Sequence, residues 1–445
     1  MMKFIPICLA LVATITTARA QEVITIQQAI ERTLNNNLQI RKSQLNEDLA
    51  FENFQQSRLA LYPSLNASLS QNMGWGRNNF GNTGIYENTQ NYSFSPGLGA
   101  SVDVFTGFAK LNQIRQNKIL LEAGKANTDK VKNDLLLQVV TAYMDILFNK
   151  DRLSAASQQL EVSRQQLAQQ QELFDVGNKT LADIAESKAL VATSELDVTT
   201  AENALAISYL TLAQLMNMPS SVKYNVQAPP LSEFSAPGMT FDAESIYSQS
   251  LKFFPDIRLA ELQTLAAEKG IDIAKGSYYP RISMNGSYGS YYNYNYNLPP
   301  AVQNQSFRDQ LENNISKGIG MSISIPIFNG FQVRSNVKRA RINYLQSQTD
   351  EELTKINLNR IIYQAVADLK GARSTYESAT KTFNARSESF AVIEQRYNVG
   401  LVNSLDFSTA QTNRNRAEID MIRARYDLLF KAKVIDYYLG KQITF

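Results

Sequence analysis

The sequence FDVGNKTLAD at residues 174–183 recurs 223 residues later as YNVGLVNSLD at residues 397–406. Each copy interrupts a long helical pattern. The aromatic residue ends one helix, and the glycine three positions later suits the left-handed conformation found just past many helix ends. A new helical pattern begins within a few residues, which is typical of the tip of a helical hairpin. The two copies therefore predict two equivalent hairpins in one chain.

The helices that lead into the two tips carry matching apolar repeats. Residues 108–174 contain no proline, and a helix of that length would extend over about 100 Å. Residues 331–397 form a second segment of equal length. The residues that recur every seven positions are Leu153, Leu160, Leu167 and Phe174 in the first segment and Tyr376, Phe383, Phe390 and Tyr397 in the second. Such a repeat is typical of a coiled-coil seam, and the matching positions indicate an internal duplication.

In both halves a shorter helix is predicted to precede a pair of strands. Thr25 and Gln28 form a capping-box pattern that opens a helix ending at Tyr62-Pro63. Asp242 is a plausible N-cap of the equivalent helix, which ends at Tyr279-Pro280. After each Tyr-Pro pair, apolar and polar residues alternate in two segments, which predicts β-strands. We expect long polar loops between the paired strands, at residues 76–91 and about 295–314, and four strands of roughly 10 to 14 residues.

Composition excludes most catalytic chemistry. The sequence has no histidine, and its one cysteine, Cys8, lies within residues 1–20, which have the basic start, apolar stretch and Ala18-Arg19-Ala20 ending of a signal peptide. The mature chain is therefore expected to lack a disulfide, a Cys/His metal site, a thiol nucleophile and an imidazole base. We expect no enzyme, cofactor or metal, although a carboxylate-only or Ser/Lys enzyme stays open. A net charge of +3 gives no electrostatic case for binding nucleic acid.

The expected organisation is a signal peptide at residues 1–20, a first repeat at 21–218, a Pro-rich linker at 219–240 and a second repeat at 241–445. The predicted strands have one apolar face and one face of small polar residues, as in a barrel with lipid outside and water inside. A soluble four-stranded sheet covered by helices is the alternative. Four strands cannot close a membrane barrel, so a membrane barrel requires several copies of the chain. The aromatic residues expected at the membrane interface are Trp75, Tyr92, Phe94, Tyr288 and Tyr292.

The order and spacing of these elements resemble the TolC-like outer membrane efflux proteins. The resemblance covers nearly all of the mature chain and rests on the duplicated helices and strand pairs and on the paired Tyr-x-Val-Gly-type tips. It implies a mainly α fold with a membrane β-barrel portion: a trimer that forms a 12-stranded barrel in the outer membrane of a Gram-negative bacterium. It also implies an α-barrel that extends into the periplasm and docks onto a periplasmic adaptor, which links it to an inner-membrane pump.

The resemblance also implies a gate of acidic residues where the tunnel narrows at the tips. Asp183 and Glu186 share one face of the first return helix, and Asp406 is the repeat-related partner of Asp183. In a trimer each would form a ring of three that attracts cations. Alternatively, acids in a first helical turn only oppose the helix dipole. The chain departs from the family pattern at Thr409, where many relatives carry a second Asp, and at Val402, where some carry an Arg.

The tip residues Val176, Gly177, Val399 and Gly400 allow two interpretations. The glycines are required by turn geometry whatever binds there, and the resemblance implies that the four residues also contact the adaptor. The leading functional hypothesis is an outer membrane exit duct of a tripartite efflux pump or type I secretion system. The alternative is a soluble periplasmic coiled-coil adaptor or structural protein. The sequence does not name the transported substrate.

Overall fold

A computed structural model of the chain describes residues 22–79, 86–219, 224–228, 241–298 and 303–443. The expected signal peptide lies outside these residues, as does most of the Pro-rich linker. The chain divides into two compact units. We call them the helical unit (Met1–Arg41, Val131–Lys252 and Leu358–Phe445) and the sheet unit (Lys42–Lys130 and Phe253–Asn357). Each unit draws on both halves of the sequence.

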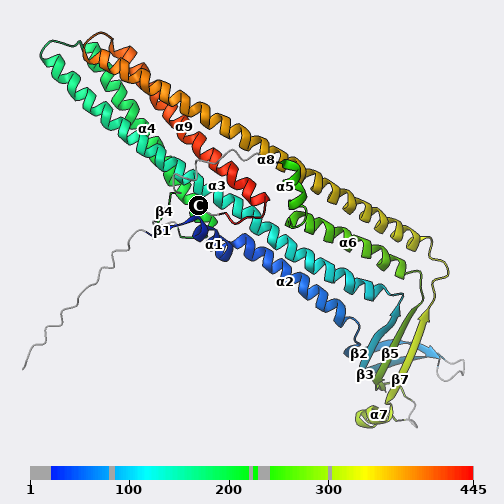
Figure 1. The fold of residues 1–445 in the computed structure, drawn as a ribbon. Helices are drawn as coiled ribbons and strands as arrows, with labels where there is room; N and C mark the ends of the chain where they lie inside the picture. The colour runs from blue at the N-terminus through cyan, green and yellow to red at the C-terminus, as the bar shows by residue number, and fades with distance from the viewer. Residues whose placement is uncertain (1–21, 80–85, 220–223, 229–240, 299–302, 444–445) are drawn as a thin grey trace, which may run out of the picture. The chain divides into compact units, whose positions relative to one another are not determined.

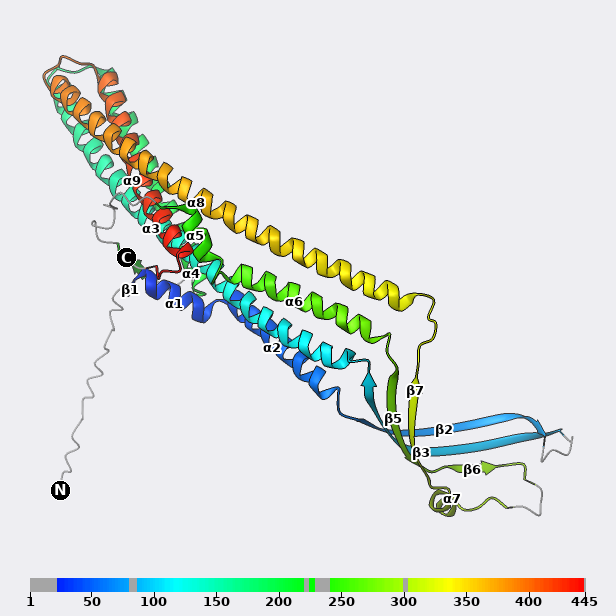
Figure 2. The same ribbon diagram turned by 45° about the vertical axis from the view of Figure 1, so that its right-hand side comes forward.

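The sheet unit is built on an antiparallel sheet with the strand order β2-β3-β5-β7 (Figures 1 and 2). The strands are β2 (Ser64–Asn79), β3 (Tyr86–Thr106), β5 (Arg281–Gly289) and β7 (Ser316–Ser324). A fifth strand, β6 (Tyr292–Asn295), also pairs with β3. The predicted loop at residues 76–91 is therefore wrong in extent, since β2 and β3 continue pairing as far as Asn79 and Tyr86. The predicted loop at 295–314 contains a short helix, α7 (Phe307–Asn313).

One face of this sheet is apolar and solvent-exposed in the single chain. Leu65, Leu69, Ile319 and Met321 are between 69% and 81% exposed. The opposite face carries mostly serine, glycine and asparagine. The strand register assigns the residues to the two faces, since residues directly paired across strands lie on the same face. An apolar face of this size is typical of contact with lipid or with another protein. No helix in the described part of the chain combines the length and hydropathy needed to cross a bilayer.

The helices that precede the strands are both interrupted, contrary to the prediction of two continuous helices. The first consists of α1 (Ile26–Asn36) and α2 (Leu38–Leu59), and the second of α5 (Ala243–Ser250) and α6 (Pro255–Gly276). The predicted caps are confirmed: Thr25 and Gln28 form a capping box, and Asp242 caps α5. The first break occurs at Asn37, whose backbone is extended and whose side-chain amide donates to the Leu215 carbonyl at 2.8 Å. The second break precedes Pro255, which cannot donate an intrahelical hydrogen bond.

Four long helices confirm the predicted hairpins, and the parts of them that follow Val131 and Leu358 supply most of the helical unit. Helices α3 (Ala109–Asp175) and α8 (Gln332–Asn398) have 67 residues each, and α4 (Leu181–Leu215) and α9 (Ser404–Tyr438) have 35 each. Between α3 and α4 the most buried positions are small or polar. Ser163 and Ser194, for example, meet at 3.1 Å between their hydroxyl oxygens. The predicted leucine seam is only half-buried. Large apolar side chains are fully buried farther from the tips, for example Ile146, Leu212 and Ile435.

A two-stranded parallel sheet closes the helical unit and was not predicted. Strand β1 (Glu22–Ile24) pairs with β4 (Tyr224–Val226), which lies within the expected linker. Tyr143 of α3 is buried beneath this pair, and its hydroxyl donates to the backbone oxygens of Gln227 at 2.8 Å and Ile24 at 3.0 Å. Burial raises the pKa of Tyr143 well above its ordinary value. One helix thus anchors two segments that are about 200 residues apart in the sequence.

Replacing Tyr143 with phenylalanine is expected to lower the free energy of unfolding by about 1–2 kcal/mol, because a buried carbonyl loses its donor. Denaturant unfolding of the detergent-solubilised protein, followed by near-UV circular dichroism, measures this loss. Tyr376→Phe is the matched control, because the Tyr376 hydroxyl has no hydrogen-bond partner among the described residues. Equal stability of the two variants would contradict the anchoring role of Tyr143.

Candidate gate at the hairpin tips

The two tips have the same backbone geometry. Gly177 and Gly400 adopt φ values of +82° and +79°, as predicted. In the first tip the Asn178 N–H donates to the Leu173 carbonyl at 2.8 Å, and in the second the Leu401 N–H donates to the Arg396 carbonyl at 2.9 Å. These bonds close the ends of α3 and α8 in the same way. An added Cβ on either glycine would meet nothing within 4 Å, so only the left-handed backbone requires glycine there.

In the first turns of the two return helices, the acidic residues make different hydrogen bonds. Thr180 and Asp183 form a reciprocal capping box at the start of α4, in which the Thr180 hydroxyl donates to the Asp183 carboxylate at 2.7 Å. At the start of α9, Asn403 takes the capping role, and its side-chain oxygen accepts from the Asp406 N–H at 2.7 Å. The carboxylate of Asp183 is thus bound to its own helix, whereas the cap of α9 leaves the Asp406 carboxylate exposed.

The two tips also contact each other, and both views place them side by side (Figures 1 and 2). The Lys179 ammonium lies 4.3 Å from the centre of the Tyr397 ring, a cation–π distance. Tyr397 is buried and stacks on Phe407 with ring centres 4.6 Å apart. Burial, together with the negative charge of Asp183, raises the pKa of Tyr397 to about 12. The phenol therefore remains neutral at physiological pH.

Glu186 accepts a hydrogen bond from a hydroxyl group of α9, and Asp183 interacts with a second α9 hydroxyl, so the two acids connect the first hairpin to the second. Partial burial raises the pKa of Asp183, but hydrogen bonds from Thr180 and Ser404 and the charge of Lys179 outweigh it and hold the pKa below its ordinary range. One turn later, the Ser408 hydroxyl donates to the Glu186 carboxylate at 2.7 Å. These two contacts define what we call the tip contact: Asp183 with Ser404 and Glu186 with Ser408.

Asp406 takes part in neither half of the tip contact. It faces a groove of about 430 Å³ between α8 and α9, together with Arg386, Arg396, Asn403 and Thr409. Within one chain the three predicted gate acids therefore do not share one set of contacts. Asp183 and Glu186 bridge two helices, and Asp406 is the acid that remains exposed. No group of described acids, histidines or cysteines is arranged to hold a metal ion.

The tips present more exposed apolar surface than the sequence suggested. Val176 and Val399, the candidate docking residues, are both 70% exposed in the single chain. Leu181, Leu401 and Leu405 are also largely exposed, although they were not singled out from the sequence. Their position within five residues after the two glycines is the signal that would have identified them.

The five aromatic residues expected at a membrane interface fall into two groups. Trp75 and Tyr288 are exposed on the apolar face of the sheet. Tyr92, Phe94 and Tyr292 are half-buried. Tyr92 and Tyr292 lie 6.0 Å apart, and Phe307 of α7 packs 5.8 Å from Phe94 and 4.9 Å from Tyr292, measured between ring centres. The second group therefore packs around α7, the helix that the sequence analysis missed.

Comparisons with known proteins agree with this geometry. The family model described as outer membrane efflux protein matches residues 29–218 and 246–441. The chain is 24% identical to outer membrane protein TolC of Escherichia coli over 99% of this chain and 87% of that protein. It is 24% identical to the probable efflux pump outer membrane protein TtgC of Pseudomonas putida, over 91% of this chain and 80% of that protein. The CmeC outer membrane channel of Campylobacter jejuni superimposes with a TM-score of 0.79 at 18% identity, covering 93% of this chain and 85% of that one.

Proposed function

Because the chain belongs to the outer membrane efflux protein family, we propose that it is the exit duct of a tripartite efflux pump or a type I secretion system. It is an outer membrane efflux channel with the fold of such channels. The observation that carries the proposal is the sheet, whose exposed apolar face opposes a face of serine, glycine and asparagine. The family match leaves the alternative of a soluble coiled-coil adaptor without support.

The proposal includes assembly of three copies. Strands β2 and β7 are the edges of the sheet in one chain. In lipid their unpaired backbone groups would each cost several kcal/mol, so open edges must pair with other strands. Three copies of β2, β3, β5 and β7 would give a closed barrel of 12 strands, with the apolar face toward lipid and the polar face toward the lumen. The two halves of the chain, residues 21–218 and 241–445, would each contribute two of its four strands.

The proposal also assigns the tips to a periplasmic adaptor that connects the duct to an inner-membrane pump. Val176, Gly177, Val399 and Gly400 lie at the ends of the two hairpins, and the two valines add to an exposed apolar surface. Exposed apolar side chains around a defined backbone turn are typical of a protein-docking surface. The acids Asp183, Glu186 and Asp406 would form the gate, with Asp406 as the exposed charge and the other two as helix-bridging contacts.

Replacing Asp406 with alanine is expected to reduce the cation preference of the channel by about twofold or more, because a ring of three carboxylates concentrates cations at the entrance. The measurement is the single-channel reversal potential in a planar bilayer under a potassium chloride gradient. Thr409→Asp is the matched opposite variant, since Thr409 lines the same groove and would gain a carboxylate. It is expected to increase the cation preference.

The possible outcomes separate the gate from the duct. If neither substitution changes the ion selectivity of the pore, the gate lies elsewhere in the channel and the duct proposal is unaffected. Absence of any pore, from a protein that remains in aqueous extracts without detergent, would contradict the duct itself.

A further inference from the structure

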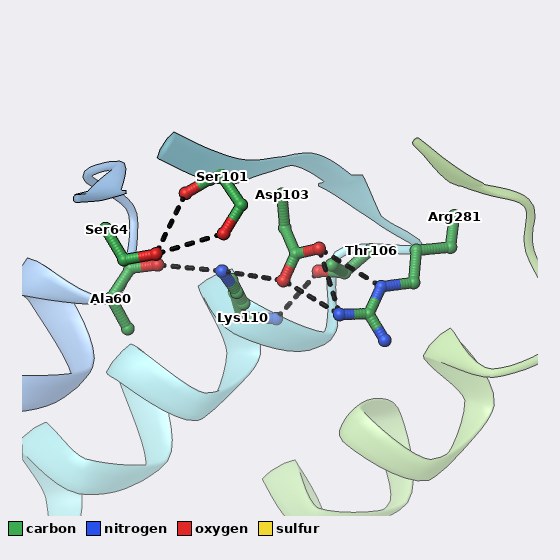
Figure 3. Close-up of polar contacts among 7 residues, drawn as sticks. All are labelled: Ala60, Ser64, Ser101, Asp103, Thr106, Lys110 and Arg281. Carbon is green, nitrogen blue, oxygen red and sulfur yellow. Dashed lines mark hydrogen bonds and ion pairs between the residues drawn. The ribbon is translucent and has the colours of Figure 1, made fainter. Parts of the chain in front are cut away.

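A cluster of three charged residues joins strands and helices in the sheet unit, at the base of β3 and β5 (Figure 3). We call Asp103, Lys110 and Arg281 the strand-root cluster. The Arg281 guanidinium binds the Asp103 carboxylate through three hydrogen bonds of 2.9 to 3.1 Å. The Lys110 ammonium lies 3.0 Å from the second carboxylate oxygen and also donates to the Ala60 carbonyl at 2.7 Å. One carboxylate is thus shared by two cations, so the cluster has a net charge of +1.

The strand register places the cluster on the polar face of the sheet. Asp103 is directly opposite Ser283, and Arg281 is two residues before Ser283 on the same strand. The pairing shifts between Asp103 and Phe105, so Val104 is an extra residue in β3. This bulge returns Phe105 to the apolar face and brings Thr106 opposite Arg281. Bulges of this kind often reorient a functional side chain.

The other described side chains of the polar face are neutral. Among the described side chains of β2, β3, β5 and β7, Asp103 and Arg281 are the only charged ones on this face, and the other positions hold mainly serine, glycine and asparagine. A groove of about 520 Å³ lies beside the cluster, lined also by Ser64, Ser101 and Ser283. The Arg281 side chain is 64% exposed despite its three bonds to Asp103. The charged side chains described on this face are therefore confined to the cluster, near the end of β3 and the start of β5.

The fold does not require this cluster, because the duplicated half forms the same turn without it. At the 223-residue spacing of the tips, Pro326 and Val333 are equivalent to Asp103 and Lys110. At the 217-residue spacing of the two Tyr-Pro pairs, which applies before the second strand pair, Ser64 is equivalent to Arg281. The turn in the first half has φ values of +60° and +64° at Gly107 and Phe108, and the turn in the second half has +60° and +62° at its equivalent residues. Identical turns with and without the charges indicate that the charges serve another purpose than closing the turn.

We propose that the strand-root cluster is a charge filter in the barrel lumen that favours anions over cations. This inference rests on the proposed trimer, in which three clusters would form one ring with a net charge of +3. A ring of fixed positive charge among side chains that are mostly small and neutral raises the local concentration of anions. The free donors of an exposed guanidinium suit carboxylate, sulfate or phosphate groups on a passing solute. The filter is opposite in sign to the acidic residues of the tips.

Reversal potentials in a potassium chloride gradient test the filter. At low salt, where screening extends beyond about 10 Å, Arg281→Ser is expected to lower the chloride-to-potassium permeability ratio by about twofold. Serine is the residue that the other half has at this position. Asp103→Asn is expected to raise the ratio by about twofold, because it removes the one negative charge. Arg281→Lys is the control that keeps the charge and is expected to leave the ratio unchanged.

Opposite shifts from Arg281→Ser and Asp103→Asn would support a filter, because a merely structural ion pair would be damaged by both substitutions in the same way. Unchanged permeability ratios in variants that still conduct would overturn the filter while leaving the channel intact. Absence of conductance in the unmodified protein would instead contradict the proposed function. If Asp103→Asn fails to assemble, the comparison of Arg281→Ser with Arg281→Lys still decides, since both retain Asp103 and Lys110.

Discussion

Alanine at Gly107 is expected to destabilise the sheet unit by about 3–5 kcal/mol, whereas alanine at Gly330 is expected to cost only about 1–2 kcal/mol. Both glycines have φ of +60°, so both substitutions place an L side chain in the left-handed region. Only at Gly107 does the new Cβ also meet other atoms: it would lie 2.1 Å from the Gly276 carbonyl oxygen and 2.8 Å from the Tyr279 Cβ. At Gly330 nothing lies within 4 Å.

The cost at Gly107 is large because the obstructing atoms belong to the backbone. Gly276 ends α6, and its own added Cβ would lie 2.9 Å from the Gly107 carbonyl oxygen, so the two glycines permit one close crossing of α6 and the turn into α3. Denaturant unfolding of the two alanine variants in detergent measures the difference. Equal losses of stability would mean that the backbone conformation alone, and not the crossing, requires glycine at residue 107.

The sequence predicted repeated elements well and their interruptions poorly. Hairpin tips, long helices and return helices follow from local signals: a left-handed glycine, an N-cap and seven-residue repeats. The break at Asn37 follows from a contact with the Leu215 carbonyl, which no local pattern reveals. The β1–β4 pair consists of three-residue strands that are held by a buried tyrosine from a distant helix. Its stability comes from tertiary packing, so strand propensity alone does not find it.

For the candidate gate, too, the sequence predicted local features well and contacts between distant segments poorly. The sequence placed Asp183, Glu186 and Asp406 near the tips, because each belongs to the first turns of a helix that follows a repeated turn. It did not show which partner each acid has, since Ser404 and Ser408 belong to the other half of the chain. Tyr397 was placed in the predicted coiled-coil seam, and it is indeed buried. Its position beside Lys179 and Asp183 was missed, because these contacts join two hairpins that the sequence separates by more than 200 residues.

Removing the tip contact is expected to open the channel. In the double variant Asp183→Ala/Glu186→Ala, the hydrogen bond that Ser408 donates to the Glu186 carboxylate is lost, as is the interaction of Ser404 with the Asp183 carboxylate. Because both acids are partly exposed, each interaction contributes about 1 kcal/mol, and its loss raises the open population about fivefold. Mean single-channel conductance measures this change. Glu195→Ala is the matched control on α4, since Glu195 pairs at 2.8 Å with Arg164 of its own hairpin and not with α9.

The packing around the tip contact makes it sensitive to this loss. Gln411 lies one turn beyond Ser408 on α9, is only 1% exposed, and has no hydrogen-bond partner for its amide among the described residues. A buried amide without partners favours any state that lets water reach it. The packing of the tips therefore depends on Asp183, Glu186 and the stacking of Tyr397 on Phe407. Conductance unchanged in the double variant and raised in the Glu195 control would contradict this assignment.

The pH dependence of conductance separates Asp183 from the other contacts. The folded-state pKa of Asp183 lies below its ordinary value, so its carboxylate stabilises the tip contact at all pH values above that ordinary value, about 4. This contribution is lost as the pH falls through the lower, folded-state pKa, because the protonated acid no longer accepts the same hydrogen bonds. Conductance of the unmodified channel is therefore expected to rise as the solution is acidified below about pH 4. In Asp183→Asn the amide carries no titratable charge, so the rise in conductance at low pH is expected to disappear if Asp183 causes it. An identical rise in the variant would assign this pH dependence to another carboxylate.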